Sequence, residues 1–130
     1  MHRVKHVLVI DDDELARLVL RAILEPVPGL RVTLADGGQA TLDLLRDNTY
    51  DLILLDLLMP GIGGIEMLTR LRKLPANRTT PVIITSVMAD ADTRIVCGSL
   101  RIADYMVKPL RRERVIGTVQ GALQEAAVAA

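Results

Sequence analysis

Residues 7–13 read Val-Leu-Val-Ile-Asp-Asp-Asp, a short apolar run that ends directly in three carboxylates. Two similar runs follow along the chain, Leu-Ile-Leu-Leu at 52–55 and Val-Ile-Ile at 82–84. Because these runs lack polar alternation, they are typical of strands buried on both faces of a parallel sheet. Residues 30–35 and 104–107 are weaker strand candidates, which we expect nearer the edges of that sheet.

Helical patterns separate the candidate strands, because apolar residues there recur at steps of three and four. The apolar faces expected for four of these helices are Leu15, Leu18, Val19, Ala22 and Ile23; Leu42, Leu44 and Leu45; Ile65, Leu68 and Leu71; and Val115, Val119, Ala122 and Leu123. A weaker helix is expected at 90–100. Strands that alternate with helices predict an α/β fold, a single doubly wound five-stranded parallel sheet with five helices on its two faces.

The composition is that of one globular domain. The 130 residues carry 16 basic and 16 acidic side chains, and this zero net charge argues against a non-specific binder of nucleic acid or membrane surfaces. Cys97 is the only cysteine, which excludes an internal disulfide or a multi-cysteine metal site. No apolar run approaches the roughly 18 residues of a membrane span. We expect one cytoplasmic domain over residues 1–130, with its core at about 4–125 and no effector domain.

Reactive side chains follow the candidate strands. Residues 11–13 follow the first strand, Asp56 the third, Thr85 closes the fourth, and Lys108 follows the fifth. Doubly wound sheets bind ligands at the carboxyl ends of their strands. Carboxylates without histidine or cysteine suit Mg²⁺, a lysine can pair with a phosphoryl group, and an aspartate can accept one as a nucleophile. These residues therefore predict Mg²⁺-assisted phosphoryl transfer to a carboxylate.

Each of these residues also has an ordinary structural interpretation. Asp13 and Glu14 are suited to cap the next helix and to meet its positive dipole end. Asp56 alone could occupy a turn, and Lys108 alone could be an exposed lysine before a proline. It is the placement of such residues at four strand ends together that favours a functional site.

Four longer segments carry a more specific signal. They read Val-Leu-Val-Ile-Asp-Asp-Asp-Glu-Leu-Ala-Arg at 7–17, Asp-Leu-Ile-Leu-Leu-Asp-Leu-Leu-Met-Pro-Gly at 51–61, Pro-Val-Ile-Ile-Thr-Ser at 81–86 and Ala-Asp-Tyr-Met-Val-Lys-Pro-Leu at 103–110. In these segments, and in their order, the sequence resembles the receiver domain of bacterial two-component response regulators. The resemblance implies a flavodoxin-like sheet in the order 2-1-3-4-5.

The resemblance also implies a role for each site residue. Asp56 would be the phosphoacceptor. Asp12, Asp56 and the backbone carbonyl of Leu58 would ligate Mg²⁺ directly, and Asp11 would position a metal-bound water. Lys108 would bind the phosphoryl oxygens.

Conformational switching is a second implication of the resemblance. Thr85 would move onto the new phosphoryl group, and Tyr105 would rotate inward into the vacated space. Without the family, Tyr105 would be a strand aromatic half-buried near an edge. The peptide bond before Pro109 would be cis. Leu58 and Val87 would flank the path of an attacking water, and since both are apolar we expect slow self-dephosphorylation.

The chain departs from the family's pattern at two places. The family often has Met-Asp-Gly where this chain has Ile-Gly-Gly at 62–64, so Gly63 removes an acid that would cap the third helix. Arg101 stands where the family usually has glycine, in the turn before the fifth strand. A positive φ at that turn would strain Arg101.

The leading interpretation is a phosphorylation-dependent switch that catalyses its own phosphorylation and dephosphorylation. The expected partners are a sensor histidine kinase or phosphotransfer protein and an unidentified effector at the surface of the fourth helix, fifth strand and fifth helix, or a second copy that meets Arg111, Arg112 and Arg114. One alternative is a degenerate receiver that acts as an interaction module without phosphorylation. Another is an aspartyl-phosphate phosphatase of the haloacid-dehalogenase type, for which Asp11 and Asp13 have the required spacing.

Overall fold

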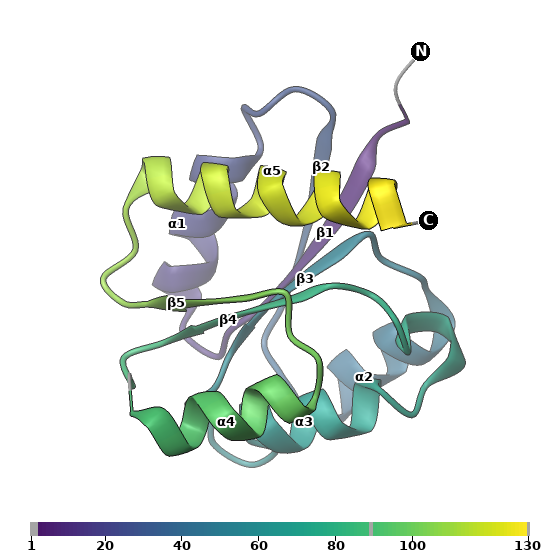
Figure 1. Cartoon of the computed structure of the whole chain (residues 1–130), viewed down its shortest axis with the longest axis vertical. Helices are drawn as coiled ribbons and strands as arrows, with labels where there is room; N and C mark the ends of the chain where they lie inside the picture. The colour runs from purple at the N-terminus through teal and green to yellow at the C-terminus, as the bar shows by residue number, and fades with distance from the viewer. Residues whose placement is uncertain (1–2, 89, 130) are drawn as a thin grey trace.

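The computed structural model describes residues 3–88 and 90–129, and within them five strands alternate with five α-helices (Figure 1). The strands are β1 (Lys5–Ile10), β2 (Leu30–Ala35), β3 (Leu52–Asp56), β4 (Val82–Ser86) and β5 (Asp104–Val107). The α-helices are α1 (Glu14–Leu24), α2 (Gly38–Asp47), α3 (Gly64–Leu71), α4 (Ala91–Ser99) and α5 (Arg112–Ala129). A short 3₁₀ helix, η1 (Pro75–Asn77), lies between α3 and β4. The predicted α/β alternation is confirmed.

The strands form one parallel sheet in the order β2-β1-β3-β4-β5. The three apolar runs are the inner strands, and the two weaker candidates are the edges, as predicted. Every residue of β3 and β4 is buried, which explains why their sequences lack polar alternation. Ile10 pairs with Leu55, so the carboxyl ends of β1 and β3 lie side by side.

Helices cover both faces of the sheet. Figure 1 shows α1 and α5 on one face and α2, α3 and α4 on the other. Each layer encloses its own aliphatic core because side chains alternate across the strands. Val7, Val9 and Leu54 face α1 and α5, where Val115 and Val119 are buried as predicted for α5.

Helix α1 is rotated away from the predicted face. Leu15, Leu18 and Val19 are exposed, at 68%, 41% and 46%, while Leu20 and Leu24 are buried against the sheet. The helix is apolar on more than one face, so three- and four-residue spacing did not select the face that is buried. Of the predicted face only Ile23 belongs to the core. One contact that fixes the rotation is a hydrogen bond of 2.7 Å from the Arg17 guanidinium to the carbonyl of Asp11.

The turn between α4 and β5 contains the strained residue that the sequence suggests. Arg101 has a φ of 61°, in the left-handed region that favours glycine. Its carbonyl accepts a hydrogen bond of 3.2 Å from the guanidinium of Arg72, which also donates to Leu100 at 3.1 Å and to Thr80 at 2.6 Å. Burial and the nearby Arg101 cation lower the pKa of Arg72. Arg72 thus joins the end of α3, the segment before β4 and the end of α4 through backbone carbonyls.

Arg101→Gly should stabilise the protein. Glycine adopts a positive φ without a Cβ clash, and the substitution also removes a cation from the neighbourhood of Arg72. The relief of the left-handed strain is offset in part by the larger backbone entropy of glycine in the unfolded chain. The net free energy of unfolding should rise by up to about 1 kcal/mol. Urea unfolding followed by circular dichroism measures it.

Arg78→Gly is the matched control. Arg78 is exposed and has a φ of −57°, so glycine there gains no relief and should lower the free energy of unfolding. Equal losses in both variants would show that the left-handed conformation of Arg101 carries no cost.

Candidate functional site

Three carboxylates meet at the carboxyl edge of the sheet. Asp11 and Asp12 follow β1, and Asp56 is the last residue of β3. A carboxylate oxygen from each lies within 4.8 Å of the other two. Asp11 is 1% exposed and Asp56 is 5% exposed, whereas Asp12 faces solvent. Adjacent parallel strands therefore bring two buried acids and one exposed acid to one point.

Lys108 supplies the positive charge of this cluster. Its Nζ lies 3.1 Å from Oδ2 of Asp11 and 3.6 Å from Oδ2 of Asp56. The Lys108 backbone N–H donates to the carbonyl of Ser86 at 2.7 Å, which continues the pairing of β5 with β4. The peptide bond between Lys108 and Pro109 is cis, as expected. The lysine thus reaches from the end of β5 across β4 to β1 and β3.

The electrostatics of the cluster are unbalanced. Burial raises the pKa of Asp56, and the Asp11 carboxylate raises it further. The Lys108 ammonium and the N–H of Leu58, which donates to Oδ1 of Asp56 at 3.3 Å, lower it only in part. Two buried carboxylates beside a single ammonium leave a local excess of negative charge, and that excess favours a further cation.

The loop after β3 is set by a close approach of backbone to backbone. The N–H of Gly64 donates to the carbonyl of Leu57 at 3.0 Å. A Cβ on Gly64 would lie 2.5 Å from the carbonyl oxygen of Asp56 and closer still to the Cα of Leu57. Gly63, the N-cap of α3, makes no side-chain cap hydrogen bond, as its identity implies. Gly64 therefore holds α3 against the end of β3 without help from a capping acid.

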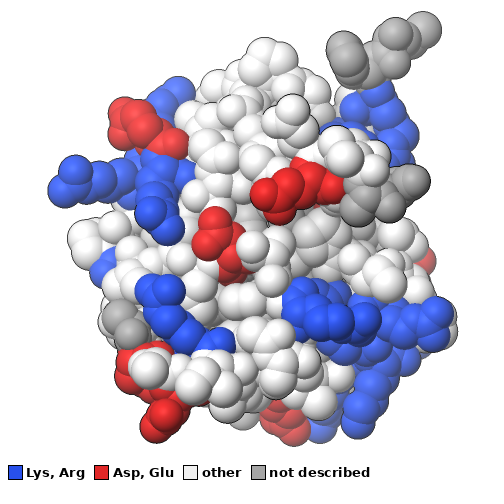
Figure 2. Space-filling view, in the orientation of Figure 1, with Lys and Arg blue, Asp and Glu red and all other residues white. Residues whose placement is uncertain are grey.

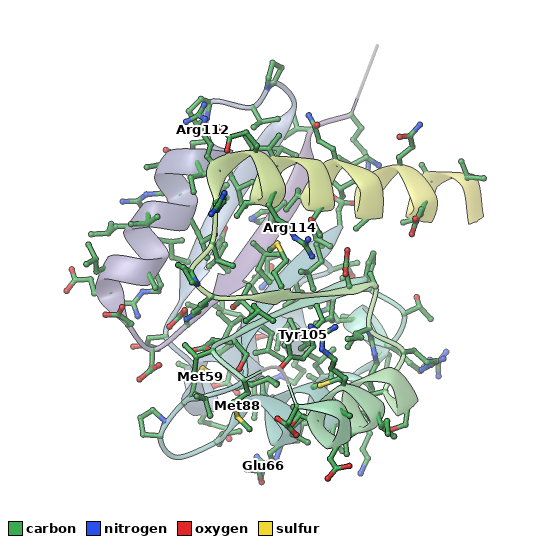
Figure 3. All side chains as sticks on the ribbon, turned by 60° about the vertical axis from the view of Figure 1, so that its left-hand side comes forward. Met59, Glu66, Met88, Tyr105, Arg112 and Arg114 are labelled. Carbon is green, nitrogen blue, oxygen red and sulfur yellow. The ribbon has the colours of Figure 1, made fainter. Side chains whose placement is uncertain are left out.

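Thr85 and Tyr105 lie on the adjoining strands. Thr85 is buried and pairs with Asp56 in the β3–β4 register. Tyr105 is 5% exposed, so the interpretation of a half-buried edge aromatic is wrong. Its hydroxyl donates to the carbonyl of Met88 at 2.7 Å, and the Arg94 guanidinium lies 4.6 Å from the centre of its ring. Figure 3 shows Tyr105 and Met88 on the side of the molecule where α4 begins.

Asp13 belongs to the helix and not to the acid cluster. It is the N-cap of α1, and its Oδ2 accepts a hydrogen bond of 3.3 Å from the N–H of Ala16. The group of acids close enough to share a metal consists, within the described residues, of Asp11, Asp12 and Asp56. The spacing of Asp11 and Asp13 therefore does not place them as the paired nucleophile and acid of a phosphatase.

Leu58 and Val87 lie in the loops that directly follow β3 and β4. Leu58 is 49% exposed and Val87 is 62% exposed, each in the loop that follows an inner strand. The role assigned to Leu58 and Val87 stays a prediction. Sequence reasoning missed Gly64, which lets α3 lie against the end of β3, and Arg94, the neighbour of Tyr105. The glycine doublet at 63–64 was a usable signal for the first, whereas the sequence holds none for the second.

Comparisons with known proteins agree with this geometry. A family model described as the response regulator receiver domain matches residues 7–120. The uncharacterized transcriptional regulatory protein YkoG of Bacillus subtilis is 32% identical over 92% of this chain and 51% of its own length. The cell cycle transcriptional regulator CtrA of Caulobacter vibrioides is 33% identical over 91% of this chain and 50% of its own length. The chain thus spans about half of each of these relatives.

Solved structures give the same result. The receiver domain of the Francisella response regulator 1452 is 33% identical, with a TM-score of 0.83 over 94% of this chain and 98% of that domain. Within the described residues, none of the helices combines the length and the apolar character needed to cross a membrane.

Gly64→Ala should destabilise the fold. The new methyl group would overlap backbone atoms of Asp56 and Leu57, which cannot turn away as a flexible side chain would. The free energy of unfolding should fall by about 1–3 kcal/mol or more, as in other overpacked sites. Chemical denaturation gives the value.

Gly98→Ala is the matched control, because Gly98 lies in α4 with no atom within 4 Å of its would-be Cβ. There alanine should stabilise the helix by up to about 1 kcal/mol. If the Gly64→Ala protein is as stable as the parent, the close packing of Gly64 against the backbone of Asp56 and Leu57 does not require glycine.

Proposed function

This chain belongs to the family of response regulator receiver domains, which accept a phosphoryl group in two-component signalling, and from that membership we propose that Asp56 is its phosphoacceptor. The observation that carries the proposal is the convergence of Asp11, Asp12 and Asp56 with Lys108 at the edge of β1, β3 and β5. Asp56 is the acid that stands at the centre of this group, between the ends of β1 and β4.

The acceptor chemistry follows from the contacts of Asp56. The donor is a phosphohistidine of a sensor histidine kinase or of a phosphotransfer protein. A carboxylate oxygen of Asp56 forms a new P–O bond while the P–N bond to the donor imidazole breaks, and the electron pair of that bond stays on the ring nitrogen. The Leu58 N–H holds Oδ1 of Asp56, which leaves Oδ2, 3.6 Å from Lys108 Nζ, as the oxygen nearer the cation.

Lys108 has a second task during transfer. In the resting site its ammonium pairs with Asp11 at 3.1 Å. The phosphoryl oxygens arrive with more negative charge than a carboxylate carries, so the flexible lysine can turn toward them without leaving the cluster. A receiver with this arrangement catalyses its own phosphorylation, because the chain holds the nucleophile and the counter-charge in place before the donor binds.

The donor set fits Mg²⁺. Asp12, Asp56 and the backbone carbonyl of Leu58 would hold the ion directly, and Asp11 would hold it through a water, since all four offer the oxygen atoms that suit a hard cation. Burial and, after it, the Asp11 carboxylate raise the pKa of Asp56, and a cation held here would offset both effects. When bound, Mg²⁺ would neutralise the carboxylates and draw charge from the transferring phosphoryl oxygens.

Signal output would pass through the surface of α4, β5 and α5. Thr85 pairs with Asp56 in the β3–β4 register, and we expect its hydroxyl to reach an oxygen of the phosphoryl group. The loop from Thr85 to α4 carries Met88, whose carbonyl binds the hydroxyl of Tyr105 on β5. A movement of Thr85 would therefore reach Tyr105 through that loop.

Incubation with acetyl phosphate and Mg²⁺ should add one phosphoryl group to the chain. Asp56→Asn should remove the adduct, because an amide oxygen is a poor nucleophile, and omission of Mg²⁺ should suppress it. Intact mass spectrometry measures the product.

Asp13→Asn is the control, since asparagine caps a helix as well as aspartate does, and this variant should be labelled like the parent. Labelling of Asp56→Asn, or no labelling of the parent under conditions that label another receiver, would contradict the assignment. The second result would favour an interaction module that works without phosphorylation.

Leu58→Asn and Val87→Glu should each shorten the lifetime of the phosphoryl group severalfold. Both side chains are exposed, Leu58 two residues after Asp56 and Val87 two residues after Thr85, and a polar side chain there would hold the water that attacks the acyl phosphate. After the donor is removed, the decay of the mass adduct gives the rate.

Leu18→Asn and Val128→Glu make the same chemical changes at exposed positions of α1 and α5, and they should leave the decay unchanged. Equal decay in all five proteins would rule out a role for Leu58 and Val87.

A further inference from the structure

The first turn of α5 has an unfavourable charge pattern for a helix. Arg111 precedes the helix and its carbonyl accepts the first helical hydrogen bond, from Val115 at 2.9 Å. Arg112 and Arg114 follow, with Glu113 as the acid of this turn. Cations at a helix N-terminus oppose the helix dipole. A segment that weakens its own helix is a candidate for a role in recognition.

These arginines border the hollow between α4, β5 and α5. The hollow has a volume of about 390 Å³, and Arg94, Arg111 and Arg114 lie on its wall together with the apolar side chains of Val107 and Leu110. Figure 2 shows basic side chains on this face toward the end where α5 begins, with acidic side chains nearer its centre. In Figure 3, Arg114 extends from α5 on the side of the molecule where Tyr105 lies.

The positive charge on this wall is not neutralised from within the chain. Over residues 3–88 and 90–128, the ion pairs within 4.0 Å involve none of Arg94, Arg111 and Arg114. Among the described residues around the hollow, Asp104 supplies the one carboxylate, and it already accepts a hydrogen bond of 2.7 Å from the N–H of Tyr105. Within the described residues, Arg111 and Arg114 are therefore exposed cations without an ion pair, whereas the Arg94 guanidinium lies over the ring of Tyr105.

This charge distribution distinguishes between classes of partner. A second copy of the chain that used the same face would present the same basic wall, on which Asp104 is the one carboxylate among the described residues and is already hydrogen-bonded, so it offers poor charge complementarity. A nucleic acid would find no stacking surface, because Tyr50 and Tyr105 are both buried, at 4% and 5% exposure. Carboxylates match the planar guanidinium groups in both charge and geometry.

We propose that the hollow between α4, β5 and α5 binds an acidic segment of a partner protein. Its carboxylates pair with Arg111 and Arg114, and an apolar side chain lies on Val107 and Leu110. The inference rests on the proposed function, which requires an output partner at this face, and it adds the chemistry of that partner.

The test is fluorescence polarisation with a fluorescein-labelled peptide of Glu-Glu-Leu repeats, on the full chain with and without acetyl phosphate and Mg²⁺. Binding should be saturable and weakened by salt. The double variant Arg111→Glu/Arg114→Glu should bind about tenfold more weakly or worse. Arg78→Glu makes a like change at an exposed residue beside η1 and should bind as the parent does.

The double variant also has a stability readout. Glutamate near the start of α5 suits the helix dipole, so the loss of binding should accompany an unchanged or higher melting temperature. Binding that survives in the double variant, or no binding in either phosphorylation state, overturns the inference. Tighter binding of single-stranded DNA, or a dimer in sedimentation equilibrium that the double variant abolishes, overturns it as well.

Labelling by acetyl phosphate separates this inference from the proposed function. Arg111 and Arg114 lie outside the acid cluster, so the double variant should be labelled at Asp56 like the parent. A labelled parent that does not bind the peptide overturns the inference alone. An unlabelled parent that binds the peptide overturns the phosphoacceptor proposal alone.

Discussion

Repulsion between Asp11 and Asp56 is the constraint around which the site is organised. The two carboxylates are buried at the ends of neighbouring strands, where water cannot screen them, and Lys108 compensates only part of their charge. Such a cluster is stable only beside cations. The same excess of negative charge that is a cost to the fold favours a further cation, and the proposed Mg²⁺ site follows from it.

The loops around this cluster are held by a few backbone contacts. Gly64 lets α3 lie against the end of β3, which orients the segment after Asp56. At the other end of the sheet, Arg72 binds the carbonyls at the end of α4, and the start of α4 is joined to β5 through Met88 and Tyr105. The end of α4 is thus held by a guanidinium that donates to several backbone carbonyls, whereas its start contacts β5 through the Tyr105 hydroxyl and the Arg94 guanidinium.

Two features of the molecule reduce its stability and invite a functional explanation. Arg101 occupies a left-handed backbone position, and Arg111, Arg112 and Arg114 oppose the dipole of α5. The first has a structural compensation, because Arg72 binds the Arg101 carbonyl. The arginines at the start of α5 have no acid partner among the described ion pairs. Their cost to the helix is therefore better explained by binding to a partner than by a contact within the fold.

The sequence alone determined which segments form strands, which of these strands lie inside the sheet and which at its edges, and which residues stand at their ends. Inner strands buried on both faces must be continuous apolar runs, and the sheet brings the carboxyl ends of its strands to one edge, so Asp11 and Asp56 could be predicted to meet there, with Lys108 from the edge strand β5. The tertiary structure decided the rotation of α1, the carbonyl contacts of Arg72 and the contact of Arg94 with Tyr105. These depend on side chains distant in sequence, and a helix that is apolar on several faces carries no local signal for which face the sheet will cover.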